Sequence, residues 1–102
     1  MSVVMVMDWA GATPEQYEKA RKLVNWEGNV PGGAQFHVTA FDDRGLRVID
    51  IWDSAEAFQA FVDERLMPGV QEVGIEGQPN VQILPTHAIF APAYERAAAA
   101  AR

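Results

Sequence analysis

The stretch GAQFHVTAFDDRGLRVIDIWDSAEAFQAF, residues 33–61, decides the fold. It contains two apolar runs, FHV and VIDIW, each with one ionisable residue inside it, and the turn-like DDRG lies between them. Runs of this composition around a turn predict a β-hairpin, with strands at about 34–41 and 46–52. The segment that follows predicts a helix beginning at Asp53 or Ser54. Its buried stripe should comprise Phe58, Phe61, Val62 and Leu66.

The rest of the chain supplies one strand and one helix before this hairpin and one strand after it. Residues 3–9, VVMVMDW, form a short apolar run typical of a central strand. Thr13, Pro14 and Gln16 predict a helix start with a capping box. Pro68 and Gly69 should interrupt the second helix, after which VQEVG, residues 70–74, could add one more short helical turn. Residues 79–90 form the last strand. This β-α-β-β-α-β order predicts a ferredoxin-like α+β domain, with two helices on one face of a four-stranded antiparallel sheet ordered 4-1-3-2.

The turn fixes the register of the hairpin. A two-residue turn or a four-residue loop makes paired residue numbers sum to 87, whereas a three-residue loop with Gly45 in a bulge makes them sum to 88. We prefer the sum of 87, which pairs His37 with Asp50 and Gln35 with Trp52. A one-residue slip of the register would place the Asp50 carboxylate in the core under the helices. The residues then expected under the helices are Phe36, Val38, Ile49 and Ile51.

The opposite face of the sheet would have no cover in a single chain. The residues expected there are Gln35, His37, Thr39, Val48, Asp50 and Trp52. An uncovered patch with this much apolar surface marks an interaction site, so we predict a homodimer in which two sheets pack face to face. The polar side chains would be sealed between subunits, where they must be hydrogen-bonded.

Length and charge narrow the class of protein. The 102 residues suit one domain, expected over residues 1–91, followed by an Ala-rich tail at 92–102. The net charge of −6 disfavours nucleic acid and anionic membranes as partners. No apolar run approaches the ~20 residues of a membrane helix. The absence of cysteine excludes disulfides and thiol chemistry, and the N-terminus has no basic signal-peptide region, so we expect a cytoplasmic protein.

The segment LRVIDIWDSAEAFQAF, residues 46–61, resembles the strand-to-helix signature of the dimeric α+β barrel superfamily. Within it, the similarity is to proteins related to antibiotic biosynthesis monooxygenases, and the element order extends it over about residues 3–90. The resemblance implies a homodimeric α+β barrel. It implies less about activity, because the superfamily includes cofactor-free monooxygenases, polyketide cyclases, haem-degrading enzymes and isomerases.

The resemblance implies no cofactor. The haem-degrading branch shares the EAFQAF element but uses an asparagine on the first strand and a histidine ligand after the second helix. The first strand here has no asparagine, and no histidine occurs between His37 and His87. Only His87 remains as an unconventional ligand. With two histidines and no cysteine, a metal site within one chain would need unusual ligands.

His37 and Asp50 are the candidate catalytic residues. A carboxylate that orients an imidazole makes a general acid–base pair. The simpler alternative is a structural cross-strand pair that satisfies two polar groups in a dimer interior.

Five further residues are candidates for substrate binding, and each also has a purely structural interpretation. They are Trp52, His87, Trp26, Phe36 and Phe61. The aromatic ones would line a pocket for a small aromatic ligand, or they would simply fill the core. His87 would approach His37 of the other subunit, or it would be an exposed edge histidine.

Two functions are consistent with these features. The first is a small cofactor-independent monooxygenase or cyclase that acts on an aromatic or polyketide-like molecule, with His37 as base or acid and Trp52 in the pocket wall. The second is a non-catalytic small-molecule-binding or stress-related dimeric accessory protein that uses the same cavity.

Overall fold

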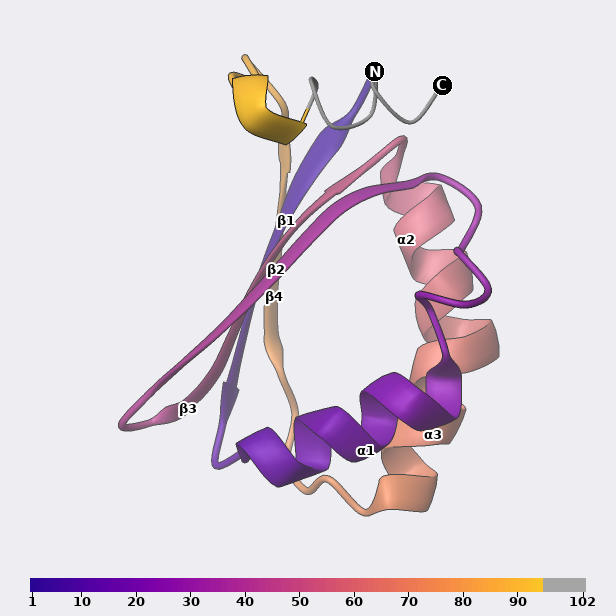
Figure 1. Cartoon of the computed structure of the whole chain (residues 1–102), viewed down its shortest axis with the longest axis vertical. Helices are drawn as coiled ribbons and strands as arrows, with labels where there is room; N and C mark the ends of the chain where they lie inside the picture. The colour runs from indigo at the N-terminus through magenta and orange to yellow at the C-terminus, as the bar shows by residue number, and fades with distance from the viewer. Residues whose placement is uncertain (95–102) are drawn as a thin grey trace.

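A single sheet and a layer of helices on one of its faces make up the computed structural model, which describes residues 1–94 (Figure 1). The strands are β1 (Val3–Ala10), β2 (Ala34–Asp42), β3 (Gly45–Trp52) and β4 (Asn80–Pro85). They are antiparallel in the order β2-β3-β1-β4. The helical segments are α1 (Pro14–Val24), α2 (Ala55–Phe61), the π-helical η1 (Val62–Leu66) and α3 (Met67–Val73).

This arrangement confirms the ferredoxin-like prediction, including the strand order. The final predicted strand is shorter than expected, since β4 ends at Pro85. The prediction of a separate Ala-rich tail falls mostly on residues 95–102, which lie outside the described residues.

Local sequence signals explain where the helices begin. Thr13 caps α1 with both halves of the predicted capping box, since its side chain accepts from the backbone N–H of Gln16 and the Gln16 side chain accepts from that of Thr13. Ser54 caps α2 by accepting from the backbone N–H of Ala57. The second helix therefore begins after Ser54, the later of the two predicted starts.

The predicted interruption at Pro68 and Gly69 is wrong. The chain stays helical from α2 through η1 into α3, which contains both residues. A proline lacks the N–H for an α-helical hydrogen bond and its ring crowds the carbonyl four residues earlier. The wider π turn at Val62–Leu66 comes directly before this point and relaxes the crowding, so the helix continues.

The β2–β3 hairpin has the predicted register over most of its length. Paired residue numbers sum to 87 from Phe36 to Asp42, and His37 lies opposite Asp50. The Asp42 carboxylate accepts backbone N–H bonds from the end of the two-residue turn. The predicted pairing of Gln35 with Trp52 is wrong, because a bulge between residues 34 and 36 places Ala34 opposite Trp52 instead.

The predicted assignment of the two sheet faces is also wrong. The helices cover the face that carries Asp50 and Trp52, while Val38 and Ile49 are exposed on the other face. The buried side chains that the sheet contributes to the core are Met5, Met7, Trp9, Leu46, Val48 and Trp52. Burying one large aromatic side chain removes at least ~150 Å² from water, worth about 4 kcal/mol. The two tryptophans therefore outweigh the cost of placing one hydrogen-bonded carboxylate on the same face.

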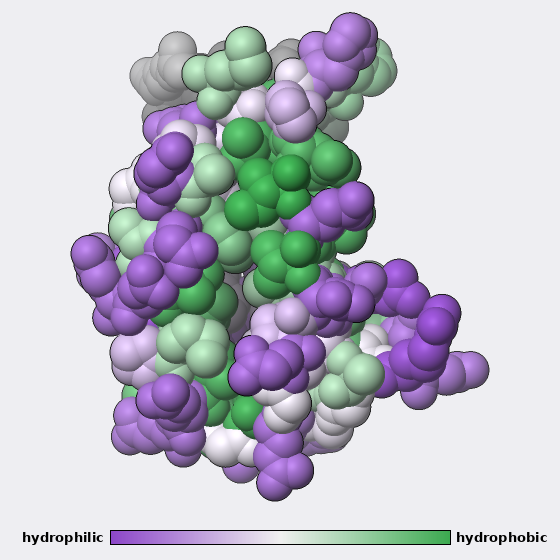
Figure 2. Space-filling model, turned by 180° about the vertical axis from the view of Figure 1, so that it is seen from behind, coloured by the Kyte–Doolittle hydropathy of each residue, from purple (hydrophilic) through white to green (hydrophobic). Residues whose placement is uncertain are grey.

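Apolar side chains also reach the surface. Figure 2 shows hydrophobic groups gathered over the middle and upper part of the molecule, with hydrophilic groups around them. The exposed large apolar residues of the strands are Val38, Phe41, Ile49, Val81, Ile83 and Leu84. The surface is therefore not uniformly polar, and part of the sheet is open for association.

A substitution at Gly69 can test how closely α3 packs against α1. A Cβ atom at this buried position would lie 2.5 Å from Cγ2 of Val24. We expect Gly69→Ala to lower the free energy of unfolding by about 1 kcal/mol, because a steric cost of about 1–3 kcal/mol exceeds the ~1 kcal/mol gained in helix propensity. Urea denaturation measures the change. Gly32→Ala is the control, since its Cβ meets no atom within 4 Å; equal stability of the two variants would contradict the close contact.

Candidate functional site

A cavity of about 290 Å³ lies between the sheet and the helices. This is near the lower end of the size range of small-molecule pockets, which starts at about 300 Å³. Its walls are mostly apolar and aromatic. The aromatic lining residues are Trp9, Tyr17, Trp26, Phe36, Trp52, Phe58 and Phe61. Three ionisable side chains besides Tyr17 also line it: Glu27, His37 and Asp50.

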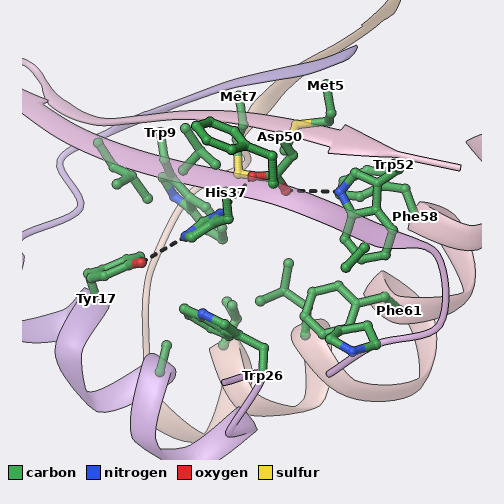
Figure 3. Close-up of a pocket in the computed structure, with 18 of the residues that line it drawn as sticks. Met5, Met7, Trp9, Tyr17, Trp26, His37, Asp50, Trp52, Phe58 and Phe61 are labelled. Carbon is green, nitrogen blue, oxygen red and sulfur yellow. Dashed lines mark hydrogen bonds and ion pairs between the residues drawn. The ribbon is translucent and has the colours of Figure 1, made fainter. Parts of the chain in front are cut away.

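The Asp50 carboxylate is the buried charge of this site. Asp50 is only 6% exposed. Both of its carboxylate oxygens nevertheless have hydrogen-bonding partners. Oδ1 lies 2.6 Å from Nδ1 of His37, and Oδ2 accepts a 3.0 Å hydrogen bond from Nε1 of Trp52 (Figure 3). A carboxylate can be buried at acceptable cost only when it is satisfied in this way.

Tyr17 and Thr39 occupy the other side of the imidazole. The Tyr17 hydroxyl lies 2.8 Å from Nε2 of His37 (Figure 3), and the Thr39 hydroxyl donates to the Tyr17 oxygen at 2.9 Å. Thr39 Oγ1 also lies 3.0 Å from Nε2. With Nδ1–H donated to Asp50, Nε2 of a neutral imidazole is an acceptor, so the Tyr17 hydroxyl donates to it. The result is a continuous hydrogen-bonded array from β3 through β2 to α1.

Trp26 closes this array on the side of the α1–β2 connection. Its ring stands edge-on to His37 at 5.5 Å and lies 5.7 Å from the ring of Tyr17. A second, more open hollow on the outside shares Glu27 and the rings of Tyr17, Trp26 and His37 with the inner cavity. The three rings therefore form part of a boundary that the cavity and the outer hollow have in common.

Burial raises the pKa of the Tyr17 hydroxyl, because the charged phenolate loses hydration when it is half-buried. The hydrogen bond from Thr39 opposes this shift only in part. At neutral pH Tyr17 is therefore a neutral phenol, with a proton to donate.

The predicted site residues separate into two groups. Trp26, Phe36, Trp52 and Phe61 line the cavity, together with the predicted acid–base pair. His87 is absent from its lining and is exposed in the segment after β4.

The predicted environment of the pair is wrong. His37 and Asp50 do meet, but they do so between the sheet and the helices of one chain. They are not on the uncovered face, where a partner sheet would have sealed them. The two buried tryptophans, Trp9 and Trp52, lie on the same face of the sheet as the pair, and their burial places that face under the helices.

Two hydrogen-bonding residues of the site were not predicted as such. Thr39 was recognisable in principle, because it is two residues from His37 on the same strand and so shares its face. Tyr17 gives no comparable signal. It lies on a helix 20 residues away, and only the packing of α1 against the sheet brings it to the imidazole.

Neither a metal cluster nor a membrane-spanning helix appears among residues 1–94. No group of three or more histidine, cysteine or acidic side chains there is placed to hold a metal ion. In the same range no helix is both long and apolar enough to cross a membrane.

Comparisons with known proteins identify the fold. No family model matches the sequence, and no curated protein matches it. Solved structures do match. SnoaB, a cofactor-independent oxygenase from Streptomyces nogalater, superposes with a TM-score of 0.60 at 12% identity, covering 86% of this chain and 93% of that one.

Two further structures show the same likeness. A candidate antibiotic biosynthesis monooxygenase from Chloroflexus aurantiacus has a TM-score of 0.53 at 17% identity, covering 88% of this chain and 98% of that one. A dimeric ferredoxin-like protein of unknown function from Thermobifida fusca has a TM-score of 0.56 at 14% identity, covering 84% and 92%. The chain is thus a ferredoxin-like α+β protein similar in fold to antibiotic biosynthesis monooxygenase-like proteins. At these identities the likeness establishes the fold alone.

The raised pKa of Tyr17 gives a test of the site. The chain has two tyrosines, so the absorbance change at 295 nm can be divided between them by comparing wild type with Tyr17→Phe. We expect the difference curve, which reports Tyr17, to titrate above the usual value near 10. Because the folded state holds this proton more tightly, Tyr17 stabilises the fold fully below pH ~10 and loses that contribution as the pH rises through its folded pKa. A difference curve centred below pH 10 would contradict the buried position.

Proposed function

We propose that this protein is a small cofactor-independent enzyme that removes a proton from a flat aromatic or polyketide-like substrate. The observation that carries the proposal is the Asp50–His37–Tyr17 array in the wall of an otherwise apolar, aromatic cavity. An imidazole held in one tautomer by a buried carboxylate is a general base with fixed orientation. The similarity in fold to a cofactor-independent oxygenase supports the same class of chemistry.

The cavity suits this chemistry because it supplies a base but few other polar groups. Loss of a proton leaves an electron pair on an aromatic substrate, which delocalises it over the rings. In a monooxygenase the resulting anion reduces molecular oxygen, whereas in a cyclase it attacks a carbonyl carbon of the same molecule. Both reactions begin with the same proton transfer, so His37 and Asp50 would serve either one.

Cavity size indicates the class of substrate. An engineered cavity of about 150 Å³ holds one benzene molecule. The cavity here, at about 290 Å³, is roughly twice that size. We therefore expect substrates with about two fused rings inside the cavity, and with any further ring or substituent directed toward the outer hollow.

A second candidate function is small-molecule binding without chemistry. The observation in its favour is that both ring nitrogens of His37 already have protein partners. A fully satisfied imidazole can be a structural part of the cavity wall. The two functions predict the same ligands but opposite results in a test of proton abstraction.

Proton abstraction can be measured with 2-tetralone, a two-ring ketone with an acidic C–H next to its carbonyl group. We expect the protein to accelerate exchange of that hydrogen for deuterium in D2O, followed by proton NMR. His37→Gln should lower the catalysed rate by about 10²–10⁴-fold, the usual contribution of a general base. Oxygen uptake with 1-naphthol distinguishes a monooxygenase from a cyclase. Binding of 2-tetralone without accelerated exchange would favour the second candidate.

We also propose that the chain forms a homodimer through the face of the sheet that the helices leave open. Three apolar residues of that face, Val38, Ile49 and Leu84, are 45%, 47% and 43% exposed. They come from three different strands, so they form a surface rather than isolated contacts. A second copy would bury the same patch on both chains. The similar structure from Thermobifida fusca, which is a dimeric ferredoxin-like protein, supports this proposal.

Light scattering at micromolar concentration should therefore give twice the chain mass of 11.2 kDa. Ile49→Lys should convert the protein to a monomer, because it places a charge at the centre of the proposed interface. Leu23→Lys is the matched control, since Leu23 is also 47% exposed but lies on α1. A wild-type monomer, or an Ile49→Lys dimer, would overturn the proposed interface.

A further inference from the structure

The arrangement around His37 raises the question of how a substrate would reach its basic nitrogen. Nδ1 faces Asp50 at 2.6 Å, and Nε2 faces the Tyr17 hydroxyl at 2.8 Å. Direct attack on the substrate proton would require Tyr17 to leave Nε2. The Tyr17 ring is held on several sides, by the rings of Trp26 and Phe41 at 5.7 and 6.2 Å and by the hydrogen bond from Thr39.

Tyr17 has one hydrogen-bonding position left for a ligand. A phenolic hydroxyl has one proton to donate and two acceptor lone pairs. The proton goes to Nε2 of His37, and one lone pair accepts from Thr39. The second lone pair has no partner among the described residues, and Tyr17 lines both the inner cavity and the outer hollow.

We propose that Tyr17 is a catalytic residue that contacts the substrate and relays its proton to His37. This inference rests on the proposed function and names the group that first receives the proton. In the step, the substrate C–H or O–H bond breaks and a new O–H bond forms on Tyr17. At the same time the original O–H bond of Tyr17 breaks and an N–H bond forms at Nε2.

The step balances without any further reactant. The electron pair of the broken bond stays on the substrate, Tyr17 is neutral before and after, and His37 carries the positive charge. The carboxylate of Asp50 lies 2.6 Å from Nδ1 and stabilises that charge. Reversal of the two transfers returns the proton to the product.

The surroundings of Tyr17 favour a concerted relay over a tyrosinate base. A half-buried phenolate is disfavoured, as the raised pKa of Tyr17 indicates. Tyr17 therefore gives up its own proton only while it accepts another. Thr39 would act as a positioning residue, because it donates to the Tyr17 oxygen and so fixes which lone pair faces the ligand.

The test is the rate of deuterium exchange into 2-tetralone at saturating concentration, measured beside the dissociation constant of 2-tetralone. We expect Tyr17→Phe to lower the rate by about 100-fold or more while the dissociation constant changes less than about threefold, because the ring is retained. Tyr94→Phe makes the same chemical change at a tyrosine that is 66% exposed, and should leave the rate unchanged.

The double variant of Tyr17→Phe and His37→Gln should be no slower than the slower single variant, because residues that act as one unit are not additive. Full exchange by Tyr17→Phe with none by His37→Gln would overturn the relay and leave the proposed function intact. A loss of rate matched by equally weakened binding would also overturn it, since that pattern indicates a structural role. Absence of exchange in bound wild type would instead overturn the proposed function, and the relay with it.

Discussion

The buried carboxylate of Asp50 is the constraint on which the site depends. It lies under the helices, where an unpaired charge would be prohibitive, so each of its oxygens must have a donor. Trp52 provides one from the same strand and His37 provides the other from the neighbouring strand. The requirement to satisfy Asp50 thereby fixes the orientation of the imidazole, and the imidazole in turn fixes where Tyr17 can bond.

The same face of the sheet serves both as the core and as the site. Its large apolar side chains exclude water, while the array of Asp50, His37 and Tyr17 places polar atoms at one edge of the cavity. The Trp52–Asp50 hydrogen bond is buried and the His37–Asp50 contact is partly buried, so both are stronger than in water, whereas the Tyr17–His37 hydrogen bond is exposed. A cavity of this kind places an oriented imidazole next to an apolar space, which is the combination on which the proposed proton abstraction rests.

The ferredoxin-like fold does not by itself determine such a site, because the fold supports many functions. The site depends on the particular set of side chains that α1 and the β2–β3 hairpin bring together. Because these side chains come from three separate elements, the array depends on the position of α1. The close approach of α1 and α3 at Gly69 holds that helix in place.

The sequence alone determined the order of the elements, the capped start of α1, the hairpin register from Phe36 onward and the pairing of His37 with Asp50. These features depend on local propensities and on a turn whose length sets the register. Only the tertiary structure decided which face the helices cover, since that depends on the summed burial of side chains from all strands, Trp9 and Trp52 above all. It also decided that Tyr17 meets His37, because a contact between a helix and a strand 20 residues apart is set by packing and not by any local pattern.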